Sequence, residues 1–156
     1  MDRTKLVVMK ISEIISENRI FFNIQVNSQS SLFKEISLKI SNIIQIRPSL
    51  IQRKLNEREK LGSTSVGNGI AIPHAKISGI NKIYGFFFKL SNFVQFDNDV
   101  SKKVNLIFVI IAPLNYQSEH LVALSSISNF LKIQDNVKKL REEKDLEKIK
   151  LLLTKN

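Results

Sequence analysis

The chain contains no cysteine and no tryptophan, and only two histidines, among its 156 residues. The absence of cysteine excludes disulfides, thiolate nucleophiles and cysteine zinc sites, and two histidines are too few for a His-rich metal cluster. Long apolar runs are missing as well, since the longest, from Leu106 to Pro113, is too short to cross a bilayer. The N-terminus has no signal-peptide pattern. We therefore expect a cytoplasmic protein with no metal site and no membrane-inserted segment.

Positive charge dominates, because the chain has 24 basic and 14 acidic residues and a formal net charge of +10. Most of the basic residues are lysines, and they are spread along the whole chain. Base readout favours arginine, so we expect a solvated lysine-rich surface and no nucleic-acid site. A positive field would still attract phosphorylated partners. Nucleic-acid binding remains an alternative that a mobility-shift assay at physiological salt would test.

Three parts of the chain have the composition of β-strands. Residues 20–26 alternate between apolar and polar side chains, which predicts a half-buried strand. The residues expected to share its inward face are Ile20, Phe22, Ile24 and Val26. Residues 83–90 and 104–111 are apolar on both faces, as is typical of buried strands, and residues 93–96 are expected to form a short edge strand.

Apolar residues at helical spacing mark the segments between these strands. One helix is predicted from Leu32, with Ser30 or Ser31 as its N-cap. The next is predicted from Pro48 to about Lys60, because proline suits the first turn of a helix.

Three further helices are predicted after the last strand. The first has Ser118 as its expected N-cap, and two short charged helices follow at about residues 135–142 and 145–153. The stripe expected to be buried on the first of them consists of Leu121, Leu124, Ile127 or Ser128, and Leu131. The order of elements predicts an α/β fold: one domain over residues 1–156, with a mixed β-sheet flanked by helices on both faces.

The stretch from Gly62 to Lys76 is the densest in chemistry-bearing residues. Its glycines allow positive φ and let a phosphate or another backbone come close. Residues 70–72 are expected to form a short strand that Pro73 ends, because proline has no N–H to donate. His74 is therefore expected at a strand end, presented at the rim of a sheet.

Two histidines are candidates for phosphoryl chemistry. A neutral imidazole is a good nucleophile near pH 7, so one ring nitrogen of His74 can accept a phosphoryl group while the other is held as a donor. His120 falls in the first turn of the helix after Ser118, where the positive helix end disfavours an imidazolium. A neutral His120 could then donate to a phosphoryl group on His74. The alternatives are an ordinary strand-end histidine and an ordinary surface histidine.

The other candidates lie beside the glycines. Arg58 falls at a helix end, and its planar guanidinium could pair with two oxygens of a phosphoryl group, although arginine also simply complements a helix dipole there. Ser63, Thr64, Gly67 and Gly69 are predicted to bind phosphate, the alternative being that such residues only form turns. The segment matches neither a P-loop nor the Rossmann fingerprint, so no nucleotide site is predicted.

The run from Arg58 to Lys76, REKLGSTSVGNGIAIPHAK, resembles the phosphorylation-site segment of enzyme IIA proteins. These belong to the fructose/mannitol class of the bacterial phosphotransferase system, and the run is most similar to the nitrogen-regulatory branch. A weaker resemblance continues through Ala112-Pro113 and Glu119-His120-Leu121, so that it covers nearly the whole chain.

The resemblance implies that His74 receives a phosphoryl group, as tele-phosphohistidine, from a small histidine-containing phosphocarrier protein. It also implies that His120 lies beside it, that Arg58 stabilises the phosphoryl charge and that no cofactor is needed. Members of the sugar-specific branch pass the group to a separate IIB domain. Nitrogen-regulatory members signal to a transporter or kinase by their phosphorylation state.

Two departures bear on the branch. Ala75 stands where the nitrogen-regulatory branch often has glycine, and residues 103–105 read Lys-Val-Asn where Pro-Val-Asp is common. The end of the chain at Asn156, without IIB or IIC sequence, favours a regulator. A stand-alone sugar-specific component and a non-catalytic protein-binding module on the same fold remain as alternatives.

Overall fold

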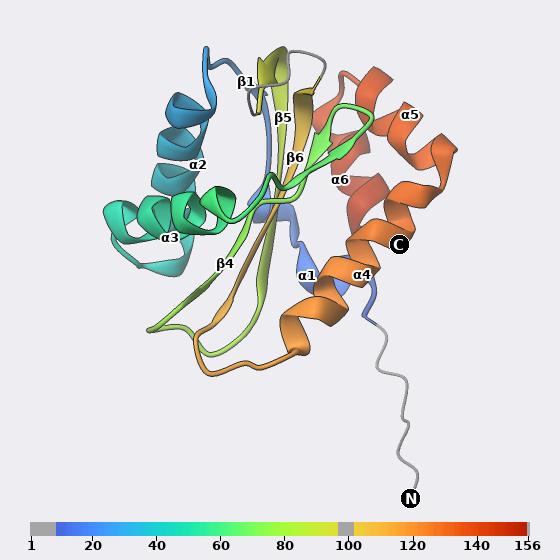
Figure 1. Cartoon of the computed structure of the whole chain (residues 1–156). Coiled ribbons are helices and arrows are strands. Elements are labelled where there is room, and N and C mark those ends of the chain that lie inside the picture. Colours follow the sequence, from blue (N-terminus) through green and yellow to red (C-terminus); the bar gives the residue numbers. More distant parts are fainter. Residues whose placement is uncertain (1–8, 97–101, 156) are drawn as a thin grey trace, which may run out of the picture.

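The protein, described here from a computed structural model over residues 9–96 and 102–155, has one mixed sheet between two layers of helices (Figure 1). The strands are β1 (Ile20–Ile24), β2 (Ser65–Gly67), β3 (Ile70–Ala71), β4 (His74–Ile77), β5 (Tyr84–Gln95) and β6 (Lys103–Pro113). Their order is β1-β5-β6-β3-β2, and β4 also pairs with β6. The predicted fold class, a mixed sheet flanked by helices on both faces, is confirmed.

The helices divide between the two faces of the sheet. They are α1 (Ile11–Ile14), the 3₁₀ helix η1 (Glu17–Arg19), α2 (Gln29–Ile44), α3 (Pro48–Lys60), α4 (Glu119–Lys132), α5 (Gln134–Glu142) and α6 (Leu146–Thr154). In Figure 1, α2 and α3 cover one face, and α1, α4, α5 and α6 cover the other. Each face has its own cluster of buried apolar side chains. No helix within the described residues is long and apolar enough to span a membrane.

The centre of the sheet is apolar on both sides, as the sequence predicts. Every residue of β6 from Val104 to Pro113 is buried. In the antiparallel partner β5, Phe86 and Phe88 point toward α2 and α3, whereas Phe87 packs on the other face against Phe108, with ring centroids 4.8 Å apart. Strands buried on both faces are the best-packed part of such a fold. This pair therefore forms a rigid support for the strands beside it.

The strand β1 does not keep a single inward face, and the prediction that it does is wrong. Asn23 has a φ of +62°, and the pairing of β1 with β5 shifts register at this point. A bulge moves every following residue to the opposite side of the sheet. Ile20 and Phe22 consequently pack with α1 and α4–α6, whereas Ile24 and Val26 pack with α2 and α3.

Two further boundaries differ from the prediction. Residues 93–96 do not form a separate edge strand, because β5 continues to Gln95 through a register shift between Lys89 and Val94. The N-cap of α2 is Ser28, whose Oγ accepts a hydrogen bond from the Ser31 amide at 3.1 Å. The helix α3 begins at Pro48 and ends at Lys60, as predicted.

Candidate functional site

The strand β4 carries His74 on an edge of the sheet. Within the described residues β4 pairs only with β6, where His74 lies opposite Ile110. The preceding β3 pairs in parallel with the same strand, and between them the Pro73 carbonyl accepts from the Ile110 amide at 3.0 Å. Pro73 thus interrupts the ladder without ending it. The predicted rim position of His74 is confirmed, although the residue begins a strand and does not follow one.

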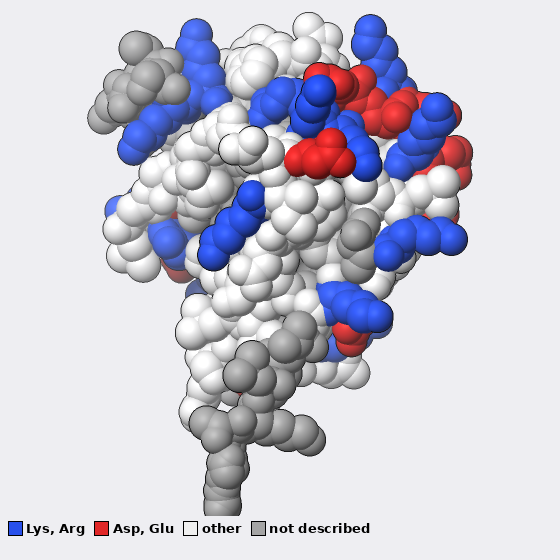
Figure 2. Space-filling model, turned by 90° about the vertical axis from the view of Figure 1, so that its right-hand side faces the viewer, with Lys and Arg blue, Asp and Glu red and all other residues white. Residues whose placement is uncertain are grey.

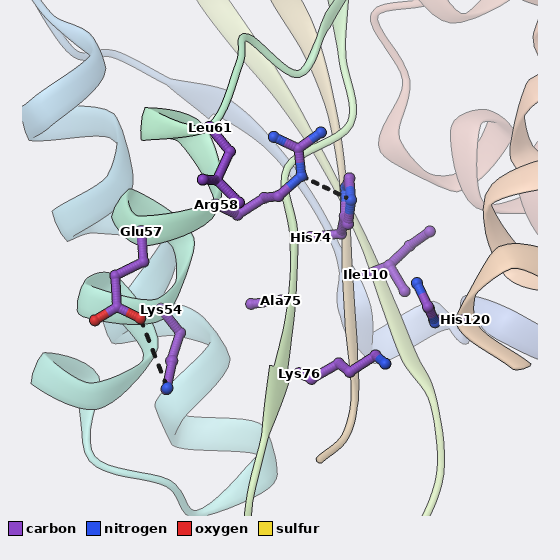
Figure 3. Close-up of a pocket in the computed structure, with 9 residues that line it drawn as sticks. All are labelled: Lys54, Glu57, Arg58, Leu61, His74, Ala75, Lys76, Ile110 and His120. Carbon is purple, nitrogen blue, oxygen red and sulfur yellow. Dashed lines mark hydrogen bonds and ion pairs between the residues drawn. The ribbon is translucent and has the colours of Figure 1, made fainter. Parts of the chain in front are cut away.

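The two ring nitrogens of His74 have different partners. Nδ1 lies 2.9 Å from the Ile72 carbonyl oxygen, and Nε2 lies 3.2 Å from the Arg58 Nε, which donates to it (Figure 3). A carbonyl can only accept, so Nδ1 carries the proton and Nε2 carries the lone pair. Burial lowers the pKa of His74, and the charge of Arg58 lowers it further against the opposing effect of the Ile72 bond. The ring is therefore held neutral with its nucleophilic nitrogen at Nε2.

Arg58 is fixed by two acceptors. It lies in the last turn of α3, and its Nη1 donates to the Gly62 carbonyl at 2.8 Å while its Nε donates to His74. Among the described residues Nη2 has no hydrogen-bond partner. A guanidinium held in this way keeps free N–H groups beside the nucleophile, where an anion can meet two of them at once.

The three residues predicted to carry the chemistry line one open pocket of about 350 Å³. Its lining consists of Lys54, Glu57, Arg58, Leu61, His74, Ala75, Lys76, Ile110 and His120. They come from α3, β4, β6 and the start of α4, as Figure 3 shows. The pocket has one carboxylate, Glu57, which pairs with Lys54 at 3.6 Å. With two imidazoles, a guanidinium and the Lys76 ammonium facing it, the pocket suits an anion.

His120 completes the far side of this pocket. Its Nδ1 is buried and has no hydrogen-bond partner among the described residues, so no protein group fixes its tautomer. Burial lowers its pKa, and the charge of Lys76 acts in the same direction, against the opposing charge of Glu119. The next residue, Leu121, is 52% exposed, so its predicted burial is wrong. The buried residues of α4 are Ala123, Ile127 and Phe130.

Lys76 is a site residue that the sequence reasoning missed. Its ammonium points toward His120 in Figure 3 and donates to the Gln117 carbonyl at 3.4 Å. The signal was available, because residues two apart in a strand point to the same side and His74 is two residues earlier. Lys76 adds a cation on the side of the pocket opposite Arg58.

The hydroxyl residues predicted to bind phosphate form hydrogen bonds within the chain. Thr64 is 5% exposed, and both its amide and its Oγ1 donate to the carboxylate of Glu59, at 2.8 and 2.7 Å. The Ser63 Oγ accepts from the Ser65 amide at 3.1 Å. Glu59, which the sequence reasoning also missed, thereby ties the end of α3 to the segment leading to β2. This tie sets where Arg58 stands relative to β4.

The structure does not bring Gly67 and Gly69 to His74. Both have positive φ, as does Asn68 between them, and together they form the turn of the β2–β3 hairpin. Arg141 of α5 donates to the Asn68 carbonyl and lies directly against Gly69. Neither glycine lines the pocket of His74. The observed use of these glycines is turn geometry, and nothing in the arrangement favours the predicted phosphate contact.

The fold and this site define a class: small α/β proteins that present a neutral histidine beside an arginine at the edge of a mixed sheet. Residues 13–156 match the family described as "Phosphoenolpyruvate-dependent sugar phosphotransferase system, EIIA 2". The chain belongs to this family of enzyme IIA proteins. The resemblance carried by residues 58–76 is therefore confirmed.

Relatives from both branches of the family are similar to the chain over most of its length. The nitrogen regulatory protein of Bradyrhizobium diazoefficiens is 34% identical over 90% of this chain and 92% of its own. A mannitol-specific phosphotransferase enzyme IIA component of Staphylococcus aureus is 30% identical, over 90% and 94%.

Solved structures agree in fold. The nitrogen regulatory protein IIA-Ntr of Neisseria meningitidis has a TM-score of 0.83 at 32% identity, covering 92% of this chain and 99% of that one. The mannitol enzyme IIA of Escherichia coli, solved in complex with phosphorylated enzyme IIB, has a TM-score of 0.73 at 20% identity, covering 89% and 96%. The second likeness bears on the fold alone.

Proposed function

We propose that the chain is a phosphocarrier of the nitrogen-regulatory kind. It accepts a phosphoryl group on Nε2 of His74 from a histidine-containing phosphocarrier protein, and its phosphorylation state controls binding to a transporter or kinase. The observation that carries the proposal is that the two nitrogens of the His74 ring have different hydrogen-bond partners. Nδ1 is held as a donor by the Ile72 carbonyl, and Nε2 faces the guanidinium of Arg58 with its lone pair.

The transfer step follows from this geometry. The Nε2 lone pair attacks the phosphorus of the donor phosphohistidine, the bond between phosphorus and the donor ring nitrogen breaks, and the donor ring keeps the electron pair. Arg58 must release Nε2 as the new bond forms, and its N–H groups then pair with phosphoryl oxygens. Catalysis of this kind consists of positioning and charge stabilisation.

The other side of the pocket supports the same role. His120 and Lys76 line the same pocket as His74, and both can donate hydrogen bonds to an anion held there. Leu61, which lines the pocket, and Leu121, which follows His120 in the chain, have exposed side chains, 84% and 52% accessible. They offer apolar contacts to a docking protein around the charged centre.

Labelling tests the proposal directly. The wild-type protein is incubated with phosphoenolpyruvate and the upstream phosphocarriers, and acid-labile label and tele-phosphohistidine are followed by mass spectrometry and ³¹P NMR. We expect one phosphoryl group in the wild type and none in His74→Ala. Lys138→Gln, a change at an exposed position of α5, is the control and should be labelled normally. Label that persists in His74→Ala would refute the proposal.

A sugar-transport role is the second candidate, because the mannitol-specific relative is nearly as similar as the nitrogen-regulatory one. In that case the phosphorylated chain would transfer its group to a cysteine of a separate mannitol-type IIB domain. Loss of label from the chain with gain by IIB in a quench-flow assay would favour transport. Stable label, with partner binding that differs between His74→Ala and the phosphomimetic His74→Asp, favours regulation. Equal binding by both variants would favour a non-catalytic module.

A further inference from the structure

A second hollow, of about 530 Å³, lies at the other end of the sheet from His74. It is lined by residues from β1, β5, β6, the end of α5 and the connection between α5 and α6: Phe22, Asn23, Lys89, Leu90, Ser91, Asn105, Arg141, Glu143 and Lys144. Asn105 precedes Ile110, the partner of His74, by five residues in β6. At a rise of about 3.3 Å per residue, the two sites are roughly 17 Å apart along the strand.

The lining of this hollow carries an excess of positive charge. Lys89, Arg141 and Lys144 are cationic, and Glu143 is the one carboxylate, so the net charge is +2. Within the described residues, none of the three cations forms an ion pair. Glu143 is already engaged, since its Oε2 accepts from the amides of Lys144 and Asp145 at 3.1 and 3.0 Å. Figure 2, which views the molecule from the right-hand side of Figure 1, shows basic and acidic side chains gathered over the upper part of that side, above a largely uncharged area.

Neutral acceptors hold two of the cations in place. The Lys89 ammonium donates to the carbonyls of Arg141 and Glu143, at 2.9 and 2.7 Å. The Arg141 guanidinium donates to the Asn105 Oδ1 at 2.6 Å and to the Asn68 carbonyl. Carbonyl oxygens orient a cation without neutralising it. Burial lowers the pKa of Lys89, and the neighbouring charges of Arg141 and Lys144 act in the same direction, against the opposing charge of Glu143.

Holding α5 and the hairpin in place accounts for Lys89 and Arg141 but not for the rest of the hollow. This structural role does not explain why Lys144 lines the same hollow, nor why further polar groups line it. The Asn105 side chain accepts from Arg141 through its oxygen, which leaves its amide N–H groups as donors. The Ser91 hydroxyl also lines the space. Preorganised donors around a net positive hollow are the ordinary components of an anion site.

We propose that this hollow binds a small organic anion that carries a phosphate or carboxylate group, with Lys89, Arg141 and Lys144 as its cationic contacts. The space exceeds what a single inorganic phosphate fills, so a metabolite with two anionic groups fits it better. Arg141 also holds the tip of the β2–β3 hairpin, through Asn68, and β3 leads directly into Pro73 and His74. The site is independent of the proposed phosphoryl transfer, but a ligand in it would contact a residue that positions the hairpin.

The test is a titration of the ¹⁵N-labelled protein at constant ionic strength, with pyrophosphate in one arm and citrate in the other. We expect saturable shifts of the backbone amides of Lys89, Ser91, Asn105 and Lys144, and the arm that saturates at lower concentration identifies the anionic group. Lys144→Gln and Ser91→Ala should each weaken binding, the former about tenfold, because a charged contact contributes roughly one decade of affinity.

The matched control is Lys138→Gln, which removes a lysine from the exposed side of α5 and should leave the affinity unchanged. Chemical shifts that change linearly with ligand concentration, without saturating, in both arms would overturn the proposal. Equal affinities for Lys144→Gln and the wild type would do the same. Among the described residues the Lys144 side chain forms no hydrogen bond or ion pair, so its replacement should leave the spectrum otherwise intact. Neither result would bear on labelling of His74.

Discussion

At the scale of single residues, the site depends on one ring whose two nitrogens are assigned by different neighbours. The Ile72 carbonyl fixes the proton on Nδ1, and Arg58 meets Nε2. The first contact is local in sequence and the second joins residues 16 positions apart. Sequence reasoning identified the three polar groups at residues 58, 74 and 120 because chemistry selects their types. The residue types alone did not identify the acceptor nitrogen, because that depends on a carbonyl and on the path of the strand. Nε2 was expected only from the family resemblance, which implies tele-phosphohistidine.

Replacing Arg58 tests the arginine directly. Arg58→Gln removes the guanidinium from Nε2 and from the developing phosphoryl charge, so we expect the rate of His74 phosphorylation to fall about 100-fold, the typical cost of one lost charge-stabilising donor. The same change should raise the pKa of His74, because the charge of Arg58 lowers it. Rapid-quench labelling gives the rate, and an NMR titration of the ring protons gives the pKa.

Lys54→Gln is the matched control for Arg58→Gln, since Lys54 lines the same pocket but pairs with Glu57. A rate for Arg58→Gln within about threefold of the control would contradict a role in charge stabilisation, since that difference is under 1 kcal/mol.

At the scale of elements, the bond between Glu59 and Thr64 ties the end of α3 to the segment that leads to β2. Thr64→Val keeps the shape of the side chain and removes the hydroxyl that donates to Glu59, leaving part of a carboxylate unsatisfied. We expect the free energy of unfolding to fall by about 1–3 kcal/mol, and phosphorylation to slow because Arg58 is less well placed. Urea unfolding and labelling measure the two effects.

Ser125→Ala, at an exposed position of α4, should change stability by less than about 0.5 kcal/mol and serves as the control. An unfolding midpoint for Thr64→Val equal to that of the control would show that the bond does not support the site.

The packing of α1 on β5 depends on the absence of a side chain at Gly85. A Cβ there would overlap the side chain of Ile14 and crowd Ile15 and the Ile14 carbonyl. Gly85→Ala should therefore lower the free energy of unfolding by about 1–3 kcal/mol, as overpacking of a filled core usually does. Urea titration measures it, with Ser78→Ala in an exposed turn as the neutral comparison. Unchanged stability would mean that α1 can move aside freely.

The elements also show where local patterns stop being informative. The central strands and the helix from Pro48 were predictable because their composition and caps act locally. The bulge at Asn23 was not, because it is a feature of the pairing of β1 with β5, a strand more than 60 residues later in the chain. The turn glycines near residue 68 suggested a phosphate contact, but their neighbour is Arg141, 73 positions away. Contacts at that separation are set by the packing of α5, which no local pattern records.

At the scale of the whole molecule, stability should depend on pH through the two histidines. The pKa of both is lowered in the folded protein, chiefly by burial, whereas in the unfolded chain they take the ordinary value of about 6.5. As pH falls below 6.5 the unfolded chain binds protons that the folded state resists, so the free energy of unfolding should decrease. It should be flat with respect to these groups above that pH, and level again below the folded pKa values.

Denaturant unfolding between about pH 5.5 and 7.5 measures this dependence, in the range where histidine is the side chain that ordinarily titrates. His74→Gln should reduce the slope, because glutamine does not titrate, and the remaining dependence should come from His120. A wild-type profile that rises on acidification would have the opposite sign and would show that the folded state favours a charged ring.

The attachment of His74 to β6 has a kinetic consequence. His74 is hydrogen-bonded through β4 to β6, in which every residue from Val104 to Pro113 is buried, so we expect its backbone to be held about as rigidly as the interior. A phosphoryl donor that docks here needs only to orient itself, because His74 does not have to be repositioned. Encounters between two such small proteins can then be short-lived and still allow transfer, as a phosphocarrier that must dissociate after each transfer requires.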